Sequence, residues 1–99
     1  MKQQFTVATR EHAELIDITD RVQTVVRESG VRSGTAQVFV PHTTAGVTIN
    51  EDADPSVVAD LLAALARAVP SDTGYRHAEG NSPAHVKASL MGFCQTVFV

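Results

Sequence analysis

The chain has 99 residues, of which 43% are hydrophobic and 19% charged, and its formal net charge is −3. This length fits one domain, residues 1–99, with one modest core. The composition disfavours disorder, collagen and membrane spans. No two Lys or Arg residues are adjacent and acidic residues are in excess, so a nucleic-acid surface built on phosphate neutralisation is not expected.

The single cysteine, Cys94, excludes an intrachain disulfide bond. The first residues lead into an alternating apolar pattern rather than an apolar signal region, and no stretch approaches the ~20 apolar residues of a spanning helix. We therefore expect a reduced, cytoplasmic protein with no membrane partner.

The N-terminal third predicts two strands and a helix. Residues 5–8 alternate in polarity and residues 15–18 return to an apolar pattern, which is typical of two strands joined by a solvated turn. Thr19 or Asp20 is expected to cap a helix with valines at spacings of three and four. Gly30 is suited to the left-handed conformation that ends such a helix.

The next segment predicts a hairpin. Residues 35–40 place small and apolar side chains on one face of a strand, which Pro41 ends. Residues 46–50 read as a second strand after a short turn, so we expect the two strands to pair. The sequence His42, Thr43, Thr44 would then lie at the end of the hairpin.

The second half predicts two helices, a long loop and a last strand. Asp54 is a good helix cap, Pro55 suits the first helical position, and an apolar stripe runs from Val58 to Val69 before Pro70. Residues 71–82 are polar and rich in turn formers, as in loops that carry function. Residues 83–91 predict a short helix, capped by Asn81 or Ser82, and residues 96–99 a strand. This order of elements predicts an α+β fold with a mostly antiparallel sheet.

Three of the four histidines lie at the ends of predicted segments, beside small polar residues: His42, His77 and His85. Brought together, three imidazoles would form an open site suited to zinc or a similar metal, with a fourth position for water or an anion. Their spacing matches no zinc-finger or zincin pattern. The alternative is that each is a surface or capping histidine. His12, in a charged turn, is assigned to the surface.

Among the carboxylates, Glu51 and Asp52 precede a predicted helix, and their negative charges would stabilise its N-terminus. Asp54 is interpreted as the cap of that helix. Glu79 lies between His77 and Asn81, so it is the better candidate for a general base or for a partner that orients an imidazole. A solvated loop glutamate is the alternative.

Asn81 and Ser82, at the start of the predicted helix 83–91, could help present main-chain N–H groups to a phosphate. The alternative is a capped helix and nothing more. Cys94 has no basic neighbour to lower its pKa, so it reads as a packing residue rather than a nucleophile.

Together these segments resemble the YjbQ-like family, whose members are described as secondary thiamine-phosphate synthases. The resemblance covers nearly the whole chain and is most specific in the run from His42 to Glu51 and in the segment from His77 to Lys87. Supporting matches are Asp17-Ile18-Thr19, Ser29-Gly30-Val31 and Asp54-Pro55.

The resemblance implies a mostly antiparallel two-sheet β-sandwich with two main helices, assembled as a homotrimer. It implies that His42, His77 and His85 bind a divalent metal ion. Three histidine ligands favour zinc, and Mg²⁺ is the alternative. The catalytic candidates are then Glu79 and Glu51. The candidates for substrate binding are Thr43, Thr44, Asn50, Asn81 and Ser82. Family members continue past the point that corresponds to Val99, so we expect the family's last strands to be missing here.

Three functions follow from these residues. The first, implied by the resemblance, is the joining of hydroxymethylpyrimidine diphosphate to thiazole phosphate with release of diphosphate. The second is metal-dependent hydrolysis of a small phosphorylated or acyl substrate. The third is a non-catalytic trimeric module that binds a small phosphorylated molecule.

Overall fold

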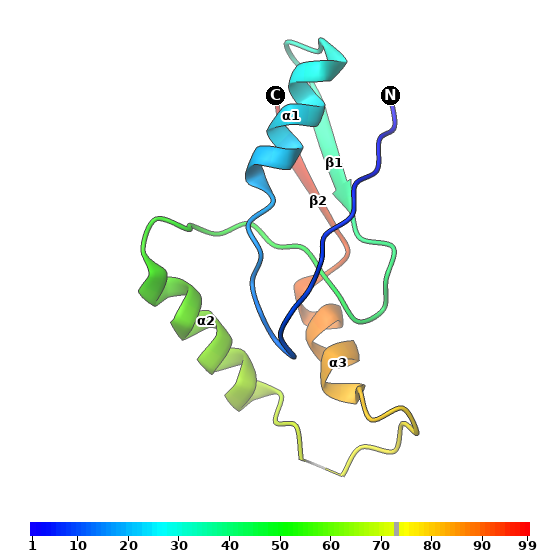
Figure 1. The fold of residues 1–99 in the computed structure, drawn as a ribbon, viewed down its shortest axis with the longest axis vertical. Coiled ribbons are helices and arrows are strands. Elements are labelled where there is room, and N and C mark those ends of the chain that lie inside the picture. The colour runs from blue at the N-terminus through cyan, green and yellow to red at the C-terminus, as the bar shows by residue number, and fades with distance from the viewer. Residues whose placement is uncertain (73) are drawn as a thin grey trace.

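The computed structural model describes residues 1–72 and 74–99 (Figure 1). In these residues the chain forms three helices and a small antiparallel sheet, an α+β fold as predicted. In chain order the elements are α1 (Thr19–Ser29), β1 (Thr35–Phe39), α2 (Pro55–Ala68), α3 (Ser82–Met91) and β2 (Cys94–Phe98). None of the described helices combines the length and the apolar character needed to span a membrane.

The sheet pairs β1 with β2 in antiparallel register, Thr35 opposite Phe98 and Phe39 opposite Cys94. The predicted hairpin between 35–40 and 46–50 is therefore wrong. The segment that follows residue 45 crosses the start of β2 instead, because the Val47 N–H donates to the Gly92 carbonyl oxygen at 3.0 Å. Since the described residues contain one sheet of two strands, the second sheet of the expected sandwich stays a prediction.

Residues 5–8 and 15–18, predicted as strands, form no strand in this structure. A ladder needs a partner on its hydrogen-bonding edge, and the N-terminal segment is held by side-chain contacts instead. The Arg21 guanidinium donates to the Thr6 carbonyl oxygen and lies 5.5 Å from the centroid of the Phe5 ring. These contacts tie the N-terminal segment to α1.

The start of α1 differs in detail from its prediction, whereas its end agrees. Ile18, not Thr19 or Asp20, is the N-cap residue, and the Asp17 side chain accepts a hydrogen bond from the Thr19 N–H at 2.8 Å. Gly30 follows the helix with φ 74°, in the left-handed region that glycine adopts without steric cost.

Local sequence explains α2. As predicted, the Asp54 side chain accepts a hydrogen bond from the Ser56 N–H at 2.9 Å, and Pro55 occupies the first turn. The helix ends at Ala68, two residues before Pro70.

The third helix, α3, begins after Asn81, as predicted. The main-chain oxygen of Asn81, rather than its side chain, accepts from the N–H groups of Ala84 and His85 at 3.1 and 3.3 Å. Gly92 ends the helix with φ 87°.

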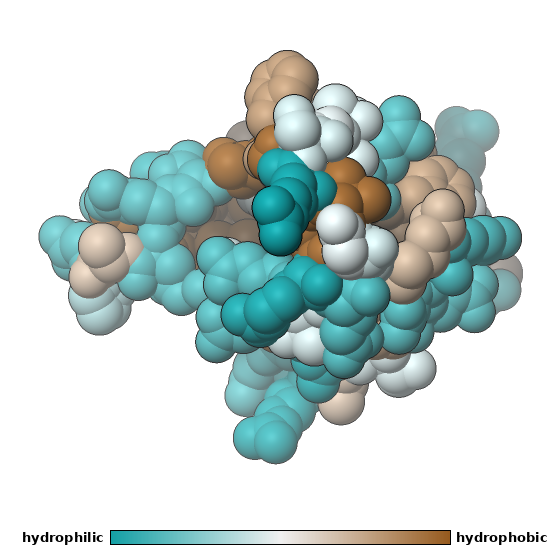
Figure 2. Space-filling view, turned by 90° about the horizontal axis from the view of Figure 1, so that it is seen from above, coloured by the Kyte–Doolittle hydropathy of each residue, from teal (hydrophilic) through white to brown (hydrophobic). Residues whose placement is uncertain are grey.

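The described residues bury little apolar surface. Among residues 1–72 and 74–99, only Val69 and Ala88 are buried, at 4% and 3% exposure, whereas Phe39 and Phe98 are 65% and 88% exposed. The accessible surface is 7766 Å², against about 5,500 Å² for a folded monomer of this mass. The radius of gyration is 15.4 Å, against about 13 Å for a compact chain of this length. Figure 2 shows apolar side chains reaching the surface among hydrophilic ones.

Candidate functional site

The loop before α3 folds back so that two of the predicted histidines meet. The Gly80 N–H donates to the His77 carbonyl oxygen at 3.2 Å, and Gly80 has φ 73°, which closes a tight turn. The rings of His77 and His85 then lie edge to face, with centroids 5.2 Å apart and planes at 90°. We call His77, Glu79, Asn81, Ser82 and His85 the α3 cluster.

Glu79 lies beside His77 in this cluster. The distance from its Oε2 atom to the His77 Nε2 atom is 3.7 Å, and both side chains are open to solvent. That distance is longer than a hydrogen bond, and an exposed pair of this kind contributes little to stability. Glu79 therefore lies beside His77 without fixing the orientation of the ring.

Asn81 supplies the buried polar atom of the cluster. Its Oδ1 atom is shielded from solvent and accepts no hydrogen bond. Leaving such an acceptor unpaired costs about 1–3 kcal/mol. The position is thus suited to a donor group or a cation that approaches the first turn of α3.

His42 and Thr43 lie elsewhere, in a shallow surface hollow that follows β1. Phe39, Val40, Pro41 and Phe93 form the rest of this hollow. In the parts of the chain that the structure describes, no group of three or more His, Cys, Asp or Glu side chains is placed to hold a metal ion. This conformation therefore joins His77 to His85 and leaves His42 outside the pair.

The remaining predicted residues belong neither to the α3 cluster nor to this hollow. Asn50 lines an apolar groove beside α2, and its side-chain oxygen accepts a hydrogen bond from the Glu51 N–H at 2.8 Å. Thr44 and Glu51 are exposed in the connections after β1 and before α2. Cys94, expected to pack, is exposed on β2 because its side chain is on the uncovered face of the sheet.

Sequence reasoning missed a pair of carboxyl groups, Asp17 and Asp52. Hydrogen bonds from Thr19 lower the pKa of Asp17. A hydrogen bond with Asp17 and the negative charge of that residue raise the pKa of Asp52. Since the two are far apart in sequence, no local pattern could have revealed the pair. By contrast, the pKa of Asp54 is lowered by hydrogen bonds from Ser56, as expected of a helix cap.

The sequence and the fold of this chain match those of a known protein family. The family model described as "UPF0047 protein YjbQ-like" matches residues 3–99. The chain belongs to this family, as the sequence resemblance indicated.

Curated relatives and solved structures agree. A UPF0047 protein of Methanocaldococcus jannaschii is 45% identical over 96% of this chain and 69% of its own length. YugU of Bacillus subtilis is 43% identical, over 100% of this chain and 76% of its own length. The crystal structure of a YjbQ/UPF0047 protein from Clostridium acetobutylicum superposes with a TM-score of 0.91 at 52% identity. That match covers 94% of this chain and 72% of the Clostridium chain.

Proposed function

We propose that this chain is a transferase of the thiamine-phosphate synthase type, with the α3 cluster as its binding site for a phosphorylated substrate. The observation that carries the proposal is the edge-to-face contact between His77 and His85, whose ring centroids lie 5.2 Å apart. Two imidazole N–H groups beside a helix N-terminus can donate hydrogen bonds to a phosphate ester.

The reaction joins two phosphorylated heterocycles. The thiazole nitrogen attacks the methylene carbon of hydroxymethylpyrimidine diphosphate, a C–N bond forms, the C–O bond breaks, and diphosphate leaves with the electron pair. The N–H groups of His77 and His85 would donate hydrogen bonds to the departing diphosphate. Glu79 and Glu51 would face the cationic pyrimidine fragment, and the substrate-binding residues would be Thr43, Thr44, Asn50, Asn81 and Ser82.

The proposal includes a divalent metal bound by His42, His77 and His85, zinc before Mg²⁺ because imidazole nitrogen is a preferred zinc ligand. When bound, the metal would withdraw negative charge from the diphosphate. The fit is incomplete in this conformation, since His42 lies in the hollow beside Phe93. The steps given above therefore use only the side chains of the chain itself.

The test incubates the purified chain with both substrates, with and without Zn²⁺ or Mg²⁺, and measures thiamine phosphate. His85→Ala should lower its formation at least tenfold, whereas the control His12→Ala, an exposed histidine outside the cluster, should leave it unchanged. Release of phosphate or acid from one substrate alone would favour a hydrolase. Substrate binding without turnover would favour a non-catalytic module. Either result contradicts the synthase proposal.

We also propose the assembly and setting that the family resemblance implies: a cytoplasmic homotrimer with a second sheet beside β1 and β2. The exposed Phe39 and Phe98 on one face of the sheet support an assembly that covers them. Light scattering should report three times the monomer mass, and a stable monomer would contradict the assembly.

A further inference from the structure

Residues 40–47 form a loop whose two ends meet at the junction between α3 and β2. The Val40 N–H donates to the Phe93 carbonyl oxygen at 2.8 Å, and the Val47 N–H donates to the Gly92 carbonyl oxygen at 3.0 Å. Because the two acceptors are neighbours in sequence, both ends of the loop are held at one place in the fold. Between these ends lie the predicted site residues His42, Thr43 and Thr44.

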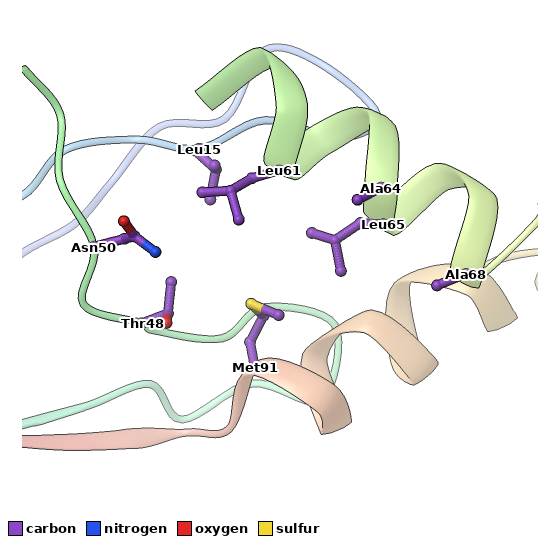
Figure 3. A pocket seen from close by; sticks show the side chains of 8 residues that line it. All are labelled: Leu15, Thr48, Asn50, Leu61, Ala64, Leu65, Ala68 and Met91. Atoms are coloured by element: carbon purple, nitrogen blue, oxygen red, sulfur yellow. The ribbon is translucent and has the colours of Figure 1, made fainter. Parts of the chain in front are cut away.

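The second end of the loop lies against the end of α3. A Cβ atom at Gly46 would collide with the Gly92 carbonyl oxygen, so the main chain approaches the helix as closely as glycine permits. The chain then continues beside the helix, where Thr48 and Met91 line one groove (Figure 3). The loop is therefore joined to the same helix whose first turns carry His85.

A side chain of the sheet also reaches this end of the loop. The half-buried face of β1 and β2 is formed by Ala36, Val38, Gln95 and Val97. Gln95 is the polar member of this set, and its Nε2 atom donates to the Val47 carbonyl oxygen at 3.2 Å, although the two residues are 48 positions apart. A polar group beside apolar side chains needs such a partner, because packing removes part of its contact with water.

Val47 is consequently held through both of its main-chain groups. Its N–H reaches Gly92 and its carbonyl oxygen reaches Gln95. A single hydrogen bond fixes a distance but leaves the chain free to turn about it, whereas a second bond in another direction fixes the orientation as well. The Gln95 side chain thus controls the direction in which the loop leaves the junction.

We propose that Gln95 is a positioning residue, whose hydrogen bond to Val47 holds the loop of residues 40–47, and with it His42, in a fixed place relative to α3. Without this donor the loop would be joined to the helix end by the Val47 N–H alone and would turn about that bond. The use of the loop for substrate binding rests on the function proposed above, whereas the action of Gln95 on the loop does not.

The experiment compares glutamines on the two faces of the sheet. Gln95→Met removes the donor with little change in side-chain length, and Gln37→Met, on the exposed face of β1, is the matched control. NMR should show exchange at the Val47 amide about tenfold faster in Gln95→Met, with less than about twofold change at the amides that pair β1 with β2. Equal exchange at Val47 in the two variants overturns the proposal. So does equal acceleration of Val47 and the sheet, because Gln95 then acts on general stability alone.

A variant that restores the donor gives a second test. Gln95→Lys carries N–H donors on a long side chain and should return exchange at Val47 to within about threefold of the parent rate. A Gln95→Lys variant that exchanges as fast as Gln95→Met contradicts the role of the hydrogen bond.

If Gln95→Met does not fold, the unaltered chain tests the same contact. The side-chain N–H groups of Gln95 should exchange about tenfold more slowly than those of the exposed Gln37. Equal rates for the two side chains overturn the proposal.

Titration with inorganic diphosphate separates this proposal from the proposed function. Gln95→Met should weaken diphosphate binding about tenfold, and Gln37→Met should leave it unchanged. If Val47 responds to Gln95→Met but the parent binds no diphosphate, or binds it as tightly as the variant does, Gln95 still positions the loop, and the proposed use of the loop for substrate binding is contradicted instead.

Discussion

Gly46 has no space for a side chain. A Cβ atom at this position would lie 2.7 Å from the Gly92 carbonyl oxygen and 2.8 Å from the Met91 Cβ atom. Both contacts are with the end of α3, and real Cβ contacts are essentially never so short. The glycine therefore permits the crossing of residues 46–47 over the start of β2.

Substitution of Gly46 should be costly. We expect Gly46→Ala to lower the free energy of unfolding by about 1–3 kcal/mol, because the added methyl group must displace main chain. Ala45→Ser, one residue earlier and exposed, is the matched control and should change little. Urea unfolding measures both. A Gly46→Ala variant as stable as the parent would contradict the close approach.

The pair Asp17 and Asp52 should make stability depend on pH. Asp17, with its lowered pKa, contributes stability that is present above its unfolded pKa and lost as pH falls through the folded value. Asp52 contributes in the opposite sense: its raised pKa gives stability that is lost as pH rises through a folded value above the usual 3.8.

Neutralising Asp52 separates the two effects. Asp52→Asn should abolish the loss of stability that occurs as pH rises above 3.8, because the amide cannot ionise beside Asp17. Chemical unfolding between about pH 3.5 and 7 measures this slope. Asp60→Asn, an exposed carboxyl group in α2, is the control. An unchanged slope in Asp52→Asn would show that the two carboxyl groups do not interact.

Each helix is set mainly by its own residues. Asp54 caps α2, Pro55 opens it, and an apolar stripe follows at helical spacing, so its sequence pattern agreed with its structure. Gly30, which follows α1, is predicted as a stop for the same local reason. The strands agreed less well, because a strand requires a partner that local sequence does not specify.

Removing the cap of α2 tests this element. Asp54→Ala should destabilise the chain by about 1 kcal/mol because the Ser56 N–H loses its acceptor. Asp54→Asn should retain most of the stability, since its amide oxygen still accepts a hydrogen bond. Thermal unfolding measures both variants. The cap would be unimportant if alanine and asparagine gave the same Tm as the parent.

At the scale of the molecule, the exposed apolar groups and the large radius of gyration indicate an open arrangement rather than a closed core. The sequence predicted one modest core for residues 1–99, and the described residues contain two small patches of it, at Val69 and Ala88. An open arrangement has local consequences that hydrogen exchange can detect.

Protection of the main-chain amides from hydrogen exchange should be uneven along the chain. We expect slow exchange for the amides that pair β1 with β2, and fast exchange for residues 48–50, whose N–H groups have no main-chain acceptor in the described structure. Mass spectrometry of exchanged peptides measures the difference, with α2 as an internal reference. Strong protection at 48–50 in the isolated chain would contradict the open groove.

The sequence by itself determined the three helices, the α+β class and the family. Helix capping, helical spacing and glycine stops act within a few residues, and the family's motifs lie in continuous runs. The tertiary structure alone decided that β1 pairs with β2, that His77 meets His85 apart from His42, and that Asp17 meets Asp52. The strand pairing and the contact of Asp17 with Asp52 join segments distant along the chain, and the packing that brings such segments together is not encoded by any local pattern. His77 meets His85 because the turn at Gly80 folds the intervening loop back, a conformation that residue spacing does not specify.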